Sequence, residues 1–336
     1  MATRDAVPIS QRLLARLGSL GVPLERAWQR ASAATGEPLV STQTTLTTAA
    51  FFAFWRAVDD EIDRRDIGLV LGTEAAERGY SVASASALHA PSLARALQTL
   101  ARYKRLTCPE DVELETRDGE ASIRFHWMLA TTEVPRLLVD STFSSFANLA
   151  RRGTGGKVTP LRIELARRSR DAALLRSHFG CRIVFGAPLD RMVFAESALA
   201  TPFVTADAEA FSRVVPGLEA ELVSRARVRS LRDEVRVAIA RNMSSGERPT
   251  VDEVARRLRV SPRTLQRRLG EEHTTYQAQL DQVRRTSARR MLANTELHPV
   301  DIAFLLGFEE PNSFVRAFRA WERTTPIRWR ERSVSA

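Results

Sequence analysis

The chain reads Val-Asp-Glu-Val-Ala-Arg-Arg-Leu-Arg-Val-Ser-Pro-Arg-Thr-Leu-Gln-Arg-Arg-Leu over residues 251–269, and this stretch decides the fold of the carboxy-terminal third. Its first half has apolar residues at helical spacing, namely Val251, Val254, Ala255 and Leu258. Ser261 and Pro262 supply an N-cap and a first-turn proline for a second helix, which buries Leu265 and Leu269. The pattern predicts two short helices joined by a tight turn, a helix-turn-helix unit.

The same pattern recurs about 48 residues later. Its apolar positions are Ile302, Ala303, Leu306, Phe314 and Phe318. Gly307 stands at the turn, where a glycine adopts a positive φ at little cost. Ala255 to Ala303 is a shift of 48 residues and Leu269 to Phe318 a shift of 49. We therefore expect the second turn to be one residue longer than the first.

The segment between the two units, residues 276–293, carries apolar residues along one helical stripe. A continuous helix there would hold the two units in a fixed relation. In DNA-binding proteins with this motif, the second helix of each unit lies in the major groove. We therefore expect the two second helices to enter successive major-groove segments of double-stranded DNA, about 34 Å apart.

Almost all of the net charge of +10 lies in this part of the chain. Residues 225–336 hold 23 arginines and 14 acidic residues, whereas residues 1–224 hold 27 basic and 26 acidic ones. Positive charge concentrated on one third of a chain is the electrostatic footprint of a polyanion partner. An arginine-rich composition also follows from a GC-rich genome, so the arrangement of the residues has to decide.

The remaining composition bounds the class of protein. With 336 residues, 44% of them hydrophobic, the chain is long enough for about two packed domains. Two distant cysteines, Cys108 and Cys181, fit a reducing compartment and provide no zinc module. We see no apolar run of membrane-spanning length and no secretory signal. We expect a cytoplasmic protein that needs no metal or other cofactor and does not associate with membranes.

The amino-terminal part predicts an α+β domain. Residues 1–106 have mostly helical periodicity, with Thr47 or Thr48 and Ser92 as candidate N-caps. Alternating apolar residues on both sides of Asp118-Gly119 predict a hairpin of two strands. Further strands are expected at residues 158–165, 182–185 and 192–194, and helices at 135–151 and 172–179. Helices followed by a mostly antiparallel sheet favour this class.

We expect Pro216-Gly217 to interrupt the helical pattern that begins near Asp207. This places a sensing domain at residues 1–215, a linker helix at 216–230 and a DNA-binding domain at 231–336. Within the last domain, the first unit spans about 251–270, the connecting helix 276–293 and the second unit about 299–321. The stripe of Val214, Val215, Leu218 and Leu222 could mediate a homodimer, although internal packing is the favoured interpretation.

Several motifs resemble the AraC/XylS family of bacterial transcription regulators over residues 231–330. They are Gly307-Phe308, Ser313-Phe-Val-Arg-Ala-Phe-Arg-Ala-Trp321, and Thr325-Pro326 followed by Arg330. Residues 174–188 resemble the amino-terminal effector domain of one branch of that family. The resemblance implies an α+β, arabinose-binding-like sensor domain, an unidentified small-molecule effector, contact with RNA polymerase and a role as an activator. A repressor, or a regulator without a small-molecule effector, is the alternative.

The resemblance also implies which residues contact DNA. Base edges would be contacted by Arg263, Gln266 and Arg267 in the first unit and by Asn312, Ser313 and Arg316 in the second. These side chains suit the task, because arginine matches guanine and glutamine or asparagine matches adenine. Phosphates would be contacted by Thr264, Arg268 and Arg319. The competing interpretation is that the arginines are ordinary solvated helix charges.

Two positions depart from the family pattern. His273 and Arg323 stand where the family favours glycine, and a non-glycine residue in the left-handed conformation costs on the order of 1 kcal/mol. Glu309 and Glu310 open the second recognition helix, where they favour its dipole but would repel phosphates.

Rival classes of function find little support in the sequence. Gly153-Thr-Gly-Gly-Lys157 lacks the serine or threonine and the earlier glycine of a phosphate loop. His178, beside Phe179, is expected to be structural rather than catalytic, and we expect no enzyme. A nonspecific nucleic-acid-binding or architectural protein remains as an alternative, but it would need neither paired recognition helices nor a neutral domain of this size.

Overall fold

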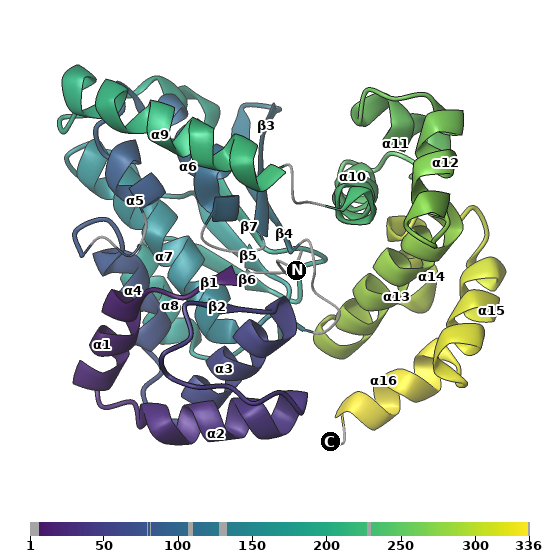
Figure 1. Cartoon of the computed structure of the whole chain (residues 1–336). Helices are drawn as coiled ribbons and strands as arrows, with labels where there is room; N and C mark the ends of the chain where they lie inside the picture. Colours follow the sequence, from purple (N-terminus) through teal and green to yellow (C-terminus); the bar gives the residue numbers. More distant parts are fainter. Residues whose placement is uncertain are drawn as a thin grey trace.

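The chain divides into an amino-terminal α+β domain and a carboxy-terminal helical domain (Figure 1). The computed structural model describes residues 7–78, 80, 82–106, 110–127, 133–226 and 230–334. This division confirms both parts of the predicted fold class, the α+β domain and the all-helical domain. Cys108 lies outside the described residues, and no helix in the described part is long and apolar enough to cross a membrane.

Six helices make up the first part of the α+β domain, with a short pair of strands, β1 (Val7–Pro8) and β2 (Thr45–Leu46), beside them. The helices are α1 (Gln11–Ser19), α2 (Leu24–Thr35), α3 (Thr48–Glu61), α4 (Ile67–Glu74), α5 (Val82–Ala87) and α6 (Leu93–Tyr103). Of the two candidate caps for α3, the side chain of Thr47 accepts the bond from Ala50 N, and Ser92 caps α6 in the same way. The aromatic stripe of α3 is buried in the core.

A five-stranded sheet follows, in the order β3-β4-β7-β5-β6. Its strands are β3 (Glu110–Arg117), β4 (Glu120–Trp127), β5 (Arg162–Leu165), β6 (Arg182–Phe185) and β7 (Arg191–Ala195). Among the described strands, only β5 and β6 pair in parallel. Asp118 and Gly119 have φ values of 53° and 77°, so the predicted hairpin turn is confirmed. The remaining elements are η1 (Lys104–Leu106), η2 (Glu196–Ala200), α7 (Arg136–Gly153) and α8 (Ala172–Phe179).

The two faces of this sheet differ because side chains alternate along each strand. Ile123 and Phe125 of β4 point into the main core, where they meet α7. The opposite face carries cross-strand charge pairs, such as Arg191 with Glu164 and Arg124 with Glu115. This polar face is the one that the helical domain approaches, since β4 lies beside α10 (Leu231–Ser244).

Helix α9 (Ala208–Ala226) contradicts the expected interruption at Pro216-Gly217, because it runs through both residues. The stripe around Pro216 packs on the core of the α+β domain, with Leu218 5% exposed and Val214, Val215 and Leu222 beside it. Glu219 also accepts hydrogen bonds from Arg102. Burial therefore outweighs the helix-breaking tendency of proline here. The stripe serves internal packing, as favoured, and we propose that the domain boundary lies after residue 226.

The helical domain consists of α10 and six further helices. These are α11 (Val251–Arg257), α12 (Pro262–Glu271), α13 (Tyr276–Asn294), α14 (Pro299–Leu305), α15 (Pro311–Glu322) and α16 (Pro326–Val334). Two separate small cores form, one around α11 and α12 and one around α14 and α15. Helix α13 contributes Leu280 to the first core and Ala288, Met291 and Leu292 to the second. One continuous helix thus joins the two units, as predicted.

Candidate nucleic-acid interface

The two helix-turn-helix units have the same turn. Val260 N donates to Ala255 O and Phe308 N to Ala303 O, both at 3.0 Å. The residue before each donor has a left-handed backbone, with φ 57° at Arg259 and 72° at Gly307. The following helices have their N-caps at Ser261 and Glu310, so the additional residue of the second turn is Glu309. The predicted one-residue difference is confirmed.

Full burial of small and apolar residues holds each unit together. Ala255 and Ala303 are both 0% exposed, which lets the second helix of each unit cross close to the first. The residues that the sequence placed inside, Leu265, Leu269, Phe314 and Phe318, are also fully buried. In the second unit, Phe314 and Phe318 pack edge to face, with ring centroids 5.7 Å apart.

On α12, the predicted contact residues form an outward surface. Arg263, Gln266, Arg267 and Arg268 are exposed, and Thr264 is half-buried. Ser261 accepts the backbone N–H of Thr264 at 3.1 Å and so caps the helix as predicted. Arg267 forms an ion pair with Glu271 one turn later. This pair is exposed, so it costs little to exchange for a partner on DNA.

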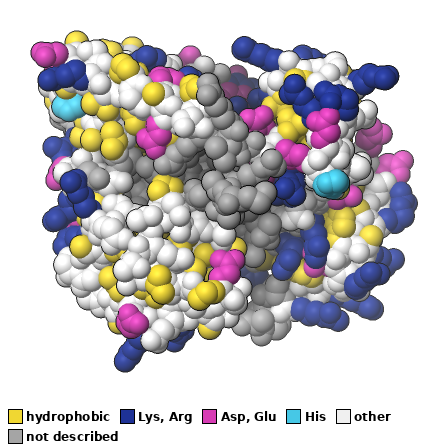
Figure 2. Space-filling view, viewed as in Figure 1, with side chains coloured by type: hydrophobic (Ala, Val, Ile, Leu, Met, Phe, Trp, Pro, Cys, Tyr) yellow, Lys and Arg dark blue, Asp and Glu magenta, His cyan; other side chains and the backbone are white. Residues whose placement is uncertain are grey.

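On α15, the corresponding residues also lie on the outside. Asn312, Arg316 and Arg319 are exposed, whereas Ser313 is half-buried and accepts a hydrogen bond from Arg316 Nη2 at 2.9 Å. The N-cap, Glu310, makes no side-chain capping bond. Figure 2 shows Lys and Arg side chains gathered along the outer edge of the helical domain, away from the α+β domain.

The acidic residue expected to repel phosphates has a basic partner. Glu309 Oε1 lies 2.5 Å from Arg248 Nη1, and both side chains are mostly exposed. Arg248 belongs to the loop before the first unit, so this ion pair links that loop to the turn of the second unit. The negative charge of Glu309 is therefore partly neutralised before any DNA approaches.

Some arginines of this domain serve the fold, which the sequence analysis missed. Arg284 on α13 donates to Leu306 O at 2.9 Å and to Gly307 O at 2.7 Å, and its guanidinium lies 4.0 Å from the centre of the Phe308 ring. Arg330 donates to Leu292 O and Leu297 O in a similar way. Burial lowers the pKa of Arg284. In the sequence, Arg330 stood out only as part of the family motif, and no pattern marked Arg284.

The two departures from the family pattern keep the left-handed backbone. His273 has φ 54° and Arg323 has φ 58°. The expected strain at both helix ends is therefore present, at about 1 kcal/mol each.

Two features considered as enzyme motifs take part in the packing and hydrogen bonding of the α+β domain. Gly153 ends α7, and a Cβ there would lie 2.3 Å from the Phe203 ring, so this glycine permits close packing. His178 Nε2 lies 2.8 Å from the Oγ of the fully buried Ser144, which also donates to Leu69 O. Burial lowers the pKa of His178, which favours the neutral ring. Within the described ranges, no group of His, Cys, Asp and Glu could hold a metal ion.

Known proteins match both domains. A family model described as the arabinose-binding domain of AraC transcription regulators matches residues 21–203, and a helix-turn-helix domain model matches residues 254–332. The ornithine utilization regulator of Pseudomonas aeruginosa is 28% identical over 268 residues, which cover 79% of this chain and 78% of that protein. The HTH-type transcriptional regulator VirS of Mycobacterium tuberculosis is 28% identical over 292 residues, or 85% and 84% of the two chains.

Among solved structures, the transcriptional regulator CdpR from Pseudomonas aeruginosa aligns with 91% of this chain and 97% of its own. The sequence identity is 20% and the TM-score 0.40.

Proposed function

Because the chain belongs to the AraC family of transcription regulators, we propose that α12 and α15 lie in two successive major-groove segments of one DNA site. The protein is a sequence-specific DNA-binding regulator. The observation that carries the proposal is the single helix α13, which is built into the cores of both units. A shared helix restricts the relative motion of the two recognition helices, so that they bind DNA as one rigid body.

We assign base contacts to Arg263, Gln266 and Arg267 in α12, and to Asn312, Ser313 and Arg316 in α15. Phosphate contacts are assigned to Thr264, Arg268 and Arg319. Support comes from the exposure of these residues, except the half-buried Thr264 and Ser313. In the described part of the chain, the arginine side chains among them also make no hydrogen bond to a backbone carbonyl. Their chemistry also fits guanine, adenine and phosphate groups.

The experiment compares Arg267→Ala and Arg319→Ala on a DNA site selected from random duplexes and on random DNA. Arg267→Ala should cost about 1–3 kcal/mol on the selected site and relax discrimination at one base pair. Arg319→Ala should weaken binding to all sequences and lower the salt dependence by about one released ion. An equal loss for Arg267→Ala on both DNAs would assign Arg267 to phosphate instead, and uniform weak protection in footprinting would favour the architectural protein.

The proposed role is regulation in the cytoplasm in response to a small molecule, with activation through RNA polymerase. The match of residues 21–203 to a family model described as an arabinose-binding domain supports the binding of a small-molecule effector. The outer face of α14 exposes Val300 and Phe304, which are free of DNA-contact assignments and suit a protein partner. Transcription in vitro with purified polymerase and the selected site distinguishes an activator from a repressor, because activation raises and repression lowers the transcript level. Sedimentation of the free protein tests for a homodimer.

A further inference from the structure

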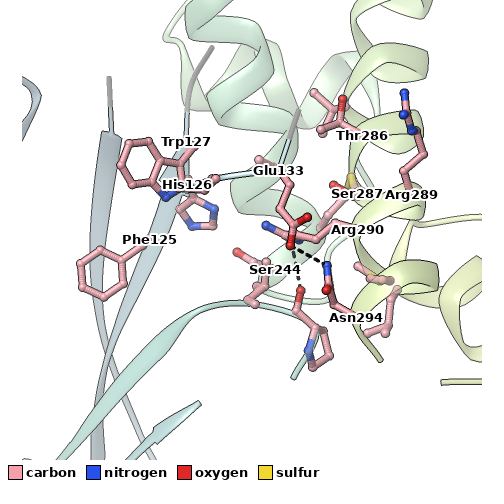
Figure 3. A pocket seen from close by; sticks show the side chains of 18 of the residues that line it. Phe125, His126, Trp127, Glu133, Ser244, Thr286, Ser287, Arg289, Arg290 and Asn294 are labelled. Carbon is pink, nitrogen blue, oxygen red and sulfur yellow. Dashed lines mark hydrogen bonds between the residues drawn. The ribbon is translucent and has the colours of Figure 1, made fainter. Parts of the chain in front are cut away.

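A cavity of about 380 Å³ lies between the two domains (Figure 3). On one side its wall consists of β4, β5 and β7, on the polar face of the sheet. On the other side it consists of α10 and α13, with Leu305 and Trp329 from the second unit. The volume lies within the range of small-molecule sites. Any molecule that fills this cavity touches the α+β domain and α13, the helix that connects the two helix-turn-helix units, at once.

Much of the lining is apolar and aromatic. The apolar side chains concerned belong to the helical domain and include Val237, Met243, Val283, Met291 and Trp329. Phe125 and Trp127 of β4 belong to the lining, but their rings pack into the core on the other face of the sheet. Such a surface suits an apolar molecular body, since aromatic and methionine side chains adapt to flat or flexible hydrocarbon groups. The cavity is therefore not suited to a small, fully hydrated ion.

Two arginines from the helical domain add positive charge and donate to neutral partners. Arg290 donates to Pro188 O at 3.1 Å, and its Nε is buried without a hydrogen-bond partner in the described part of the chain. Arg236 donates to the neutral Gln279 at 2.7 Å. Burial lowers the pKa of both guanidiniums. Because the hydrogen-bond acceptors of both guanidiniums are neutral, an anion in the cavity would supply the negative charge that these acceptors lack.

The other charges of the lining are largely neutralised. Arg191 and Arg124 have carboxylate partners on the sheet, Glu164 and Glu115. Glu133 accepts a hydrogen bond from Asn294 at 3.0 Å, and Figure 3 shows its side chain beside Arg290. The charges of the buried Asp190 and of Glu133 both act against burial on the pKa of Arg290 and offset part of the excess. The lining residues include five arginines and two glutamates, so the lining itself carries a net positive charge.

We propose that this cavity binds the effector and that the effector is an organic carboxylate with an apolar body. This inference rests on the proposed response to a small molecule. The carboxylate contacts Arg290 and Arg236, and the apolar body lies against the side chains of Met243, Met291 and Trp329 in the helical domain. Charge-assisted hydrogen bonds in a partly dehydrated site are the strong ones, so charge selects the ligand class.

Binding there controls how the helical domain sits on the sensor. The direct polar contacts between the domains include a hydrogen bond from Arg241 to Asp111 at 2.7 Å and one from Arg168 to Ala293 O at 2.8 Å. A ligand that bridges both walls stabilises the docked arrangement over any undocked one. It shifts that equilibrium by as much as its affinities for the two arrangements differ. The affinity for DNA therefore changes when the ligand binds.

Calorimetric titration of the full-length protein with 4-phenylbutyrate and octanoate tests the ligand class, and the two neutral amides serve as controls. We expect at least one carboxylate to bind and its amide to bind at least about tenfold more weakly. Arg290→Met should weaken the carboxylate by about tenfold to a hundredfold. Ala240→Phe, which fills the cavity from α10 and keeps Arg290, should abolish binding. Circular dichroism verifies that both variants fold.

Arg267→Ala separates this inference from the proposed DNA function, because it should lose specific DNA binding and keep full carboxylate affinity. The inference is wrong if neither carboxylate binds while the unliganded protein reads its selected site. It is equally wrong if the amides bind as well as the acids, or if binding survives both cavity variants. A carboxylate that binds at the cavity without changing the affinity for DNA would overturn its regulatory role.

Discussion

The two helix-turn-helix units share one geometry but reach it with different residues. In the first unit, Thr250 and Ser261 cap both helices with their hydroxyl groups, while Arg259 occupies the left-handed turn at a cost. In the second, Gly307 suits the turn, but Glu310 leaves α15 without a side-chain cap. The first unit therefore depends on good helix ends, and the second on a good turn and on support from α13.

The separate cores predict the largest effect. Ala303→Glu places an unpaired charge in a fully buried position and should cost about 3–5 kcal/mol, enough to unfold the second unit. Specific DNA binding should disappear, whereas hydrogen exchange should show α11 and α12 still protected. Ala255→Glu should instead unfold the first unit and leave α14 and α15 protected from hydrogen exchange.

Ala278→Glu is the matched control, because Ala278 is exposed in the first turn of α13. It should change neither stability nor binding by much. Loss of protection throughout the domain in Ala303→Glu would show that the two units fold as one.

The support that α13 gives to the second unit predicts the next largest effect on stability. Arg284→Met removes the donor to Leu306 O and Gly307 O and should destabilise the second unit by about 1–3 kcal/mol, because those carbonyls lose their charged partner. Urea unfolding followed by tryptophan fluorescence measures this. Arg256→Met, at an exposed ion pair in the first unit, should change stability by less than about 0.5 kcal/mol. Equal losses in the two variants would mean that Arg284 supports nothing.

The role of Arg284 also shows where sequence reasoning ended. Spacing and caps located both units, the connecting helix and the longer second turn, because these depend on contacts near in sequence. The excess of arginine in residues 225–336 indicated a polyanion partner but could not separate the arginines that contact it from those that support the fold. Only the fold shows that Arg284 and Arg330 bind helix-end carbonyls, since those partners come from other elements.

The continuity of α9 and the cavity between the domains could not be predicted from the sequence for the same reason, because both depend on contacts between distant parts of the chain. A proline-glycine pair predicts a break locally, and burial of Leu218 in the core of the α+β domain explains why the helix continues. The cavity is formed by residues far apart in the chain, such as Phe125 and Arg290. The single sequence contained no pattern that would bring them together.

Helix capping predicts an intermediate effect of opposite sign in the two units. Ser261→Ala removes the bond to Thr264 N and should cost about 1 kcal/mol. Glu310→Ser supplies the missing cap and should stabilise the second unit by up to about 1 kcal/mol, and it should also tighten DNA binding by removing a negative charge. Urea midpoints and titration with labelled DNA measure the two effects. A second unit that becomes less stable in the Glu310→Ser variant would indicate that the Glu310 carboxylate already stabilises the helix dipole by more than a cap would.

The turns predict the smallest effect. Arg259 is exposed at φ 57°, and the equivalent position of the second unit is already glycine. Arg259→Gly should stabilise the first unit by about 0.5 kcal/mol, because relief of left-handed strain exceeds the extra chain entropy of glycine only slightly. His273→Gly, at φ 54° after α12, is the companion variant and should gain a similar amount. Urea midpoints of the two single variants and of the double variant measure the gains, which should add because the positions lie at opposite ends of α12. A loss of stability in Arg259→Gly alone would show that the arginine side chain, and not its backbone, determines the first turn.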